Sequence, residues 1–182
     1  SLIFFSYFKN RLLPVLIKLD LLLNILAQFL FLLNFSSMPF VKIYIHLVWS
    51  TKNRVPHLNS KELRLTVWNH IRENAQKKEI FVDFINGYSD HCHCLISLGV
   101  DQTIEKTVQL LKGESSFWIN KNGLTSEKFE WQDEYFAVSV SESQIDRVRD
   151  YIKKQEEHHL KKTFKEEYEE FISKYGFQKL KG

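Results

Sequence analysis

The pattern of apolar and polar positions from Val41 onward predicts strands and helices that alternate along the chain. Short stretches rich in β-branched and aromatic residues are typical of strands, whereas apolar residues three or four positions apart are typical of amphipathic helices. By these signals the sequence predicts four strands, over residues 41–50, 80–88, 91–98 and 134–141. The predicted helices cover about 59–78, 103–120, 144–160 and 163–176.

The order of these elements predicts the fold. Strand, helix, strand, strand, helix and strand, followed by two helices, is the order of the ferredoxin-like split βαβ arrangement. The expected fold class is therefore α+β, with one antiparallel sheet, helices on one face and a further C-terminal helix. Two candidate capping boxes, Asn59 with Glu62 and Thr163 with Glu166, predict where two of the helices begin. Because this fold hosts many functions, it does not indicate one by itself.

The first 37 residues differ in composition from the rest of the chain. They hold 24 apolar residues, with three Lys or Arg and one Asp, while the following 145 residues hold 22 basic and 21 acidic residues. The only Met of the chain, Met38, lies at this boundary. We therefore expect residues 1–37 to be an apolar leader outside the native protein. We expect residues 38–182 to form the functional domain and this domain not to associate with a membrane.

Two other interpretations of this leader stay open. As a membrane anchor or interfacial helix, its longest apolar stretch covers 21–33, whereas a bilayer requires about 20 apolar residues. As a signal peptide, it has Lys9 and Arg11 before an apolar stretch, but no small-residue cleavage site follows.

Charge and cysteine content narrow the class of protein. Lys and Arg total 25 against 22 Asp and Glu, a net charge of +3, which is too balanced for a polybasic nucleic-acid coat. Two cysteines, Cys92 and Cys94, cannot form a disulfide framework, so a reducing, cytoplasmic location is expected.

The sharpest local feature is the run from His91 to Cys94. On a strand, residues two apart share a face, so His91 and His93 present two imidazoles side by side while Cys92 and Cys94 face the core. Two imidazoles on one face are half of a divalent metal site. A zinc site using all four side chains is disfavoured because the alternation separates the thiols from the imidazoles. The alternative is a pair of half-exposed histidines without a ligand.

A second feature lies on the third predicted helix. Tyr151 and Gln155 are four residues apart and so share a helix face. A phenol can act as a covalent nucleophile in phosphodiester transfer, and an amide oxygen can help to hold the metal ion that polarises the phosphate. The alternative is that Tyr151 is an ordinary packed aromatic residue.

Together these features resemble a known family. From Met38 to about Gly176 the chain is similar to the IS200/IS605-type single-tyrosine transposases of the HUH endonuclease superfamily. The similarity rests on five segments in the expected order: 45–52, His91-Cys92-His93, 111–116, 131–135 and 151–159.

The resemblance implies a specific chemistry. His91, His93 and Gln155 would bind one Mg²⁺ or Mn²⁺, and Tyr151 would attack the scissile phosphate to leave a 5′-phosphotyrosine and a 3′ hydroxyl. The substrate would be single-stranded DNA with hairpins near the element ends. The family is homodimeric, and the tyrosine helix of one chain can complete the site of the other.

Two alternative functions stay open at this point: a domesticated relative that processes chromosomal repeat hairpins, and a non-catalytic nucleic-acid-binding module. His46 is expected either to approach the site or to be a core histidine. His158 and His159 are expected at a solvated helix end, and the alternative is that either one substitutes for Gln155 as a ligand. Phosphate contacts supply most sequence-independent affinity for DNA. The candidate DNA-binding residues are Lys52, Arg54, Lys112, Arg147, Lys153 and Lys154.

Overall fold

The computed structural model describes residues 13–34, 40–159 and 162–175 of the chain. The chain divides into two compact units, Ser1–Phe40 and Val41–Gly182. The first contains one described helix, α2 (Leu13–Asn34). Among the described residues, no helix has the length and apolar character needed to cross a membrane. The separation of residues 1–37 from a domain of residues 38–182 stays a prediction.

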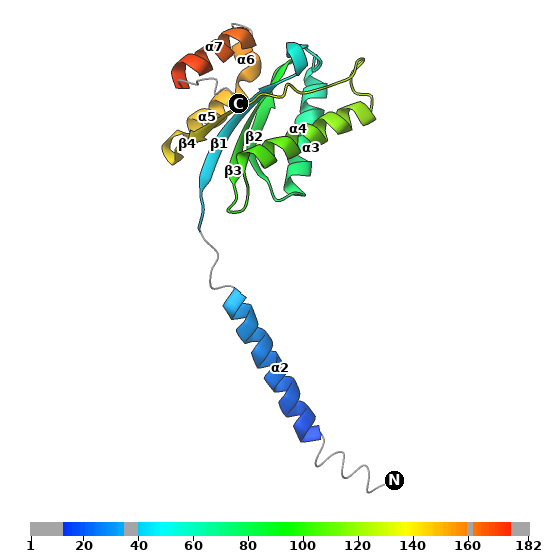
Figure 1. Ribbon diagram of the computed structural model, residues 1–182, viewed down its shortest axis with the longest axis vertical. Helices are drawn as coiled ribbons and strands as arrows, with labels where there is room; N and C mark the ends of the chain where they lie inside the picture. The colour runs from blue at the N-terminus through cyan, green and yellow to red at the C-terminus, as the bar shows by residue number, and fades with distance from the viewer. Residues whose placement is uncertain (1–12, 35–39, 160–161, 176–182) are drawn as a thin grey trace. The chain divides into compact units, whose positions relative to one another are not determined.

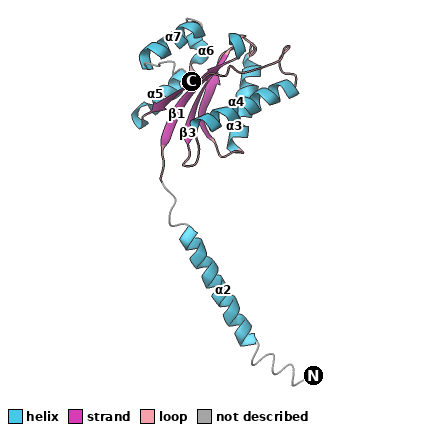
Figure 2. Ribbon diagram, viewed as in Figure 1, coloured by secondary structure: helices cyan, strands magenta, loops and turns pink. Residues whose placement is uncertain are grey.

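The second unit is built on a four-stranded sheet (Figure 2). Its strands are β1 (Ile43–Ser50), β2 (Phe81–Gly87), β3 (His91–Leu98) and β4 (Phe136–Val140), in the spatial order β2-β3-β1-β4. All three pairings are antiparallel. This is the strand order of the split βαβ fold, so the predicted fold class is confirmed.

Helices α3 (Lys61–Gln76) and α4 (Ile104–Lys121) cover one face of the sheet (Figure 1). Their apolar stripes bury the main core, which includes Leu47 on β1 and Trp68 on α3. Cys92 and Cys94 are free thiols in this core, with no exposed surface. The expectation that both cysteines face the core is therefore confirmed.

Three C-terminal helices lie on the opposite face: α5 (Ile145–Lys153), α6 (Gln155–His159) and α7 (Phe164–Tyr175) (Figure 1). A second, smaller apolar cluster of Leu95, Ile145 and Ile152 attaches α5 to β3. Short 3₁₀ turns, η2 (Lys52–Arg54) and η3 (Glu142–Gln144), follow β1 and β4. The sheet is thus a shared middle layer, with the core on one side and the C-terminal helices on the other.

The expected helix starts are only partly correct. Helix α7 has the predicted capping box, because Thr163 Oγ1 accepts from the Glu166 N–H and Glu166 Oε2 accepts from the Thr163 N–H. The box expected at Asn59 is wrong, since the N-cap of α3 is Ser60, whose hydroxyl accepts from the Leu63 N–H at 3.0 Å.

One other expectation about the helices is wrong. The helix expected over 144–160 is interrupted at Lys154, where φ is −92° and ψ is 16°, and continues as α6. On α4, Ile119 is buried, whereas Phe117 is 64% exposed.

We expect the core on the α3–α4 side to dominate stability. Leu47 is fully buried, so Leu47→Ala should lower the free energy of unfolding by about 2–5 kcal/mol through lost burial and the cavity that remains. Leu65 on α3 is 50% exposed, and Leu65→Ala should change the free energy of unfolding by less than about 0.5 kcal/mol. Urea unfolding followed by tryptophan fluorescence compares the two, and equal losses would contradict this assignment of the core.

Candidate metal and nucleophile site

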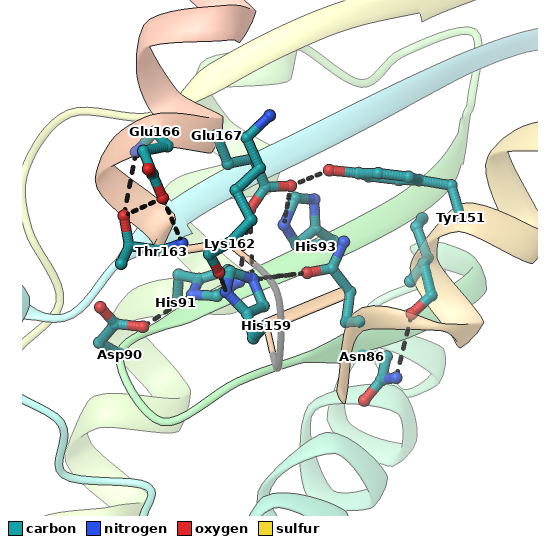
Figure 3. A network of polar contacts seen from close by, with 12 residues as sticks. Asn86, Asp90, His91, His93, Tyr151, His159, Lys162, Thr163, Glu166 and Glu167 are labelled. Atoms are coloured by element: carbon teal, nitrogen blue, oxygen red, sulfur yellow. Dashed lines mark hydrogen bonds and ion pairs between the residues drawn. The ribbon is translucent and has the colours of Figure 1, made fainter. Parts of the chain in front are cut away.

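Strand β3 carries two histidines to the α5–α7 face of the sheet. The side chains of His91 and His93 lie within one network of polar contacts (Figure 3). Neither has any exposed surface, so the alternative of two half-exposed histidines is wrong. A tight turn precedes them, and a Cβ on Gly87 would lie 2.2 Å from the His91 carbonyl oxygen. Only glycine allows β2 to approach the start of β3 so closely, which fixes the position of the first imidazole.

Both imidazoles are oriented through Nδ1. His91 Nδ1 lies 2.8 Å from the Asp90 carboxylate, and His93 Nδ1 lies 3.1 Å from Nε2 of His46 on β1. A tautomer with hydrogen on each Nδ1 satisfies both contacts and leaves the two Nε2 lone pairs available. Outer contacts of this kind commonly orient histidines that bind metals. His46 is 4% exposed and approaches the site, which decides between its two expected roles.

The C-terminal helices bring oxygen atoms to these nitrogens. Gln155 begins α6 with its side chain fully buried, and its Oε1 lies 3.3 Å from His91 Nε2. Glu167 of α7 is 2% exposed, and its Oε1 lies 3.3 Å from His93 Nε2. His159 closes the set, with Nε2 at 3.1 Å from Gln155 Oε1 and 3.2 Å from Glu167 Oε2.

The donor atoms of this cluster fit a divalent cation. One ligand atom from each of His91, His93 and Glu167 lies within 4.8 Å of the others. Ligands bound at 2.0–2.1 Å around one octahedral ion lie about 3 Å apart, so small side-chain movements would suffice. His93 Nε2, Gln155 Nε2 and Glu167 Oε2 are buried without a hydrogen-bond partner among the described residues. Buried polar atoms without partners are rare. A bound cation would satisfy two of these three atoms, His93 Nε2 and Glu167 Oε2.

Burial favours the neutral form of two imidazoles in the cluster, those of His93 and His46. It holds the pKa of His93 well below its usual range, and the neighbouring His91 and His159 lower it further. The pKa of His46 is lowered in the same way, first by burial and then by His93. Burial raises the pKa of Glu167 to about 7. Neutral imidazoles carry the lone pairs that a metal ion requires.

The predicted nucleophile lies at the edge of this cluster. Tyr151 on α5 donates its phenolic hydrogen to Glu167 Oε1 (Figure 3). Its ring lies 5.6 Å from the His93 ring and 6.2 Å from the His46 ring, at steep angles to both. One carboxylate therefore connects the phenol to the histidine pair.

Four residues that were named from the sequence lie close together, and their roles stay predictions. The structure brings together His91, His93, Gln155 and Tyr151, although the helix break at Lys154 means that no shared helix face aligns the last two. Glu167 was missed. The sequence signal for it is a carboxylate on the apolar face of the last helix, three and four residues from Phe164 and Phe171.

The expectation of a solvated end for α6 is wrong for His159. Its side chain is 3% exposed, and its ring stacks 5.1 Å from the ring of Tyr88. It also lies 4.4 Å from the His91 ring. His158 is partly buried, with its ring 5.6 Å from the Tyr151 ring.

The candidate DNA-binding residues occupy four different places. Lys153 and Lys154 are exposed where α5 ends, and Arg147 is exposed beside a cavity that Tyr151 also lines. Lys52 and Lys112 instead both contact Asp133. The Asp133 carboxylate pairs with Lys52 at 3.5 Å, and the Asp133 carbonyl accepts a hydrogen bond from Lys112 at 2.8 Å.

Arg54 lies over aromatic rings of α7. The assignment of these six residues to DNA stays a prediction.

Comparison with known proteins places the chain in a family. Strand β3 carries two histidines and α5 carries a tyrosine beside them, the arrangement that the resemblance to single-tyrosine transposases predicts. The model of the IS200-like transposase family matches residues 39–155. The chain belongs to the IS200-like transposase family.

Two solved structures share the fold. A candidate transposase from Deinococcus radiodurans R1 has a TM-score of 0.53 and 22% identity, over 66% of this chain and 95% of its own. A REP-associated tyrosine transposase bound to a REP hairpin has a TM-score of 0.50 and 15% identity, over 68% of this chain and 73% of its own. No curated protein matches the chain.

The cluster predicts binding of a divalent cation without DNA. Titration of Mn²⁺ into the protein, followed by calorimetry, should show a single site that His93→Ala weakens more than about tenfold. The control is His70→Ala, because His70 also lies beside a carboxylate, Glu114 at 2.9 Å, but outside the cluster. Equal affinities of the two variants would contradict the assignment of the site.

Proposed function

We propose that this protein cleaves and rejoins single-stranded DNA at hairpin-bearing ends of a mobile element. The observation that carries the proposal is that one carboxylate, Glu167, accepts a hydrogen bond from Tyr151 and also lies 3.3 Å from His93 Nε2. Family membership supports the transposase function, and one protein of the same fold is known with a hairpin bound.

The proposed reaction uses Tyr151 as nucleophile. Its phenolic oxygen loses its proton and attacks the scissile phosphorus, the bond to the 3′ oxygen breaks, and that oxygen takes up a proton from solvent, so that the strand is left as a 5′-phosphotyrosine and a 3′ hydroxyl. In the absence of DNA the phenol donates to Glu167 Oε1, which supports this carboxylate as the group that takes up the phenolic proton before the strand displaces it. Attack by a different 3′ hydroxyl reverses the step and rejoins strands without an external energy source.

His91, His93 and Gln155 would hold the metal ion in this reaction, and Glu167 would complete the set in the absence of DNA. We propose Mg²⁺ or Mn²⁺. The bound ion would polarise a phosphate oxygen and favour attack by the phenol. The phosphate and the Glu167 carboxylate are both anions that require the same partners. The DNA phosphate therefore replaces the Glu167 carboxylate beside the histidines. This replacement requires α7, which carries Glu167, to move away from the cluster.

The arrangement of Tyr151 bears on the homodimer implied by the family. In this chain the phenol lies against the chain's own cluster. We propose a homodimer in which each chain can assemble its site in cis, and we place the protein in the cytoplasm. A domesticated relative that processes chromosomal hairpins would use the same chemistry, and hairpins that bracket the gene would favour the mobile element.

Tyr151→Phe should remove covalent capture of DNA. Incubation with Mn²⁺ and a labelled single-stranded hairpin from the DNA that flanks the gene should give an adduct visible on a denaturing gel. The variant should reduce the adduct to background, because only the attacking oxygen is lost. Tyr44→Phe, the same change in the same apolar cluster, should retain it. If wild type and Tyr151→Phe give equal amounts of adduct, Tyr151 is not the nucleophile. If the protein binds hairpins with the same affinity in chelator as with the metal ion and does not cleave them, the non-catalytic binding module is favoured.

A mixture of two defective proteins tests the cis arrangement. Tyr151→Phe lacks the nucleophile and His91→Ala lacks a ligand, so neither should form adduct alone. If each site is assembled within one chain, mixing them restores nothing. Adduct in the mixture would show that the tyrosine of one chain serves the histidines of another.

A further inference from the structure

A cavity of about 510 Å³ lies beside the histidine cluster on the same face of the sheet. It is bounded by β1, η2, the start of β4 and α7, and its size is within the range of roughly 300–1,000 Å³ typical of small-molecule sites. Phe164 connects it to the cluster, because this side chain lines the cavity and stacks on the His91 ring, with centroids 4.2 Å apart. The cavity therefore begins one aromatic ring away from the proposed metal site.

The walls of this cavity combine aromatic rings with a cation. Phe164 and Tyr168 of α7 line one wall, and Tyr135 and Phe136 contribute from the chain entering β4. The guanidinium of Arg54 lies 4.7 Å from the centroid of the Tyr168 ring and 5.4 Å from that of Phe164. Among the described residues, Arg54 takes part in no ion pair. The cavity also contains one carboxylate, that of Glu134, and the described contacts of the guanidinium are with the two aromatic rings.

The loop that supplies Arg54 is held in an uncommon conformation. Asn53 and Arg54 have φ of 55° and 58°, in the left-handed region that side chains other than glycine seldom adopt. The Asn53 N–H donates to Gln132 Oε1 at 3.2 Å, and the Lys52 N–H donates to the Glu130 carbonyl at 2.8 Å. Backbone strain of this kind persists where surrounding contacts enforce it, and it is common at ligand sites.

We propose that this cavity binds one unpaired nucleobase of the DNA strand, next to the phosphate that is cut. Aromatic side chains in a cationic groove are the usual means of holding unpaired bases, and arginine adds both a cation–π contact and a phosphate contact. This inference rests on the proposed function, which supplies a single strand at the adjacent cluster. Arg54 then acts as a base-positioning residue and not as a general surface cation.

The test uses a fluorescent base analogue and does not require cleavage. Full-length Tyr151→Phe protein with Mn²⁺ is titrated into hairpin oligonucleotides from the DNA that flanks the gene, each with 2-aminopurine at one position of a single-stranded tail. At one position, stacking should quench the analogue, and an abasic site there should weaken binding about tenfold. Adding Tyr168→Ala should remove both effects, whereas Tyr168→Phe should retain them.

Phe117→Ala is the matched control, because Phe117 is an exposed aromatic residue on α4 outside the cavity. Adduct formation by wild-type protein on the same oligonucleotides reports separately on the proposed function. If adduct forms but no position responds to Tyr168→Ala, the base site is refuted and the function stands. If quenching responds to Tyr168→Ala but wild type forms no adduct, the site is supported and the cleavage chemistry is refuted. Equal losses from Tyr168→Ala and Phe117→Ala would also refute the base site.

Discussion

The alternation of side chains along β3 is the constraint on which both the core and the site depend. Because successive side chains point to opposite faces, Cys92 and Cys94 enter the core under α3 and α4, and His91 and His93 reach the other face. A shift of one residue in the pairing of β3 with β1 would place imidazoles in the apolar core and thiols at the site. The core on one face therefore fixes the position of the histidines on the other, and because that core holds most of the buried apolar residues, the second face can carry buried polar groups.

Burial of polar groups on this second face requires partners, and the chain supplies them from distant segments. Asp90 and His46 hold the Nδ1 atoms, while α6 and α7 contribute Gln155 and Glu167. Several of these buried atoms still lack a hydrogen-bond partner among the described residues, and such atoms carry a cost unless something else satisfies them. The lack of hydrogen-bond partners distinguishes the cluster from the pair of His70 and Glu114, whose side chains contact each other at 2.9 Å and so satisfy one another.

The sequence predicted the sheet well, because the period of two and the β-branched composition are local signals. β3 was predicted with its observed ends, 91–98. The break at Lys154 was missed because Lys153-Lys154-Gln155 contains neither glycine nor proline, and the docking of α6 against His91 is a tertiary contact with no local signature. The burial of His159 was missed for the same reason. Glu167 was visible in principle, since a carboxylate between Phe164 and Phe171 interrupts an apolar face, but only the structure shows which groups it meets.

Helix α7 links the two halves of the second face. Phe164 lies between the His91 ring and the cavity that contains Arg54, and Glu167, one turn further along, lies between His93 and Tyr151. One side of this helix therefore touches the cluster, the nucleophile and the cavity at the same time. A strand that displaces the carboxylate must shift the same helix whose aromatic rings line the cavity. Binding of a phosphate at the cluster and binding of a neighbouring base in the cavity are therefore coupled through α7. A substitution on α7 that contacts only one of the two sites should alter binding at both.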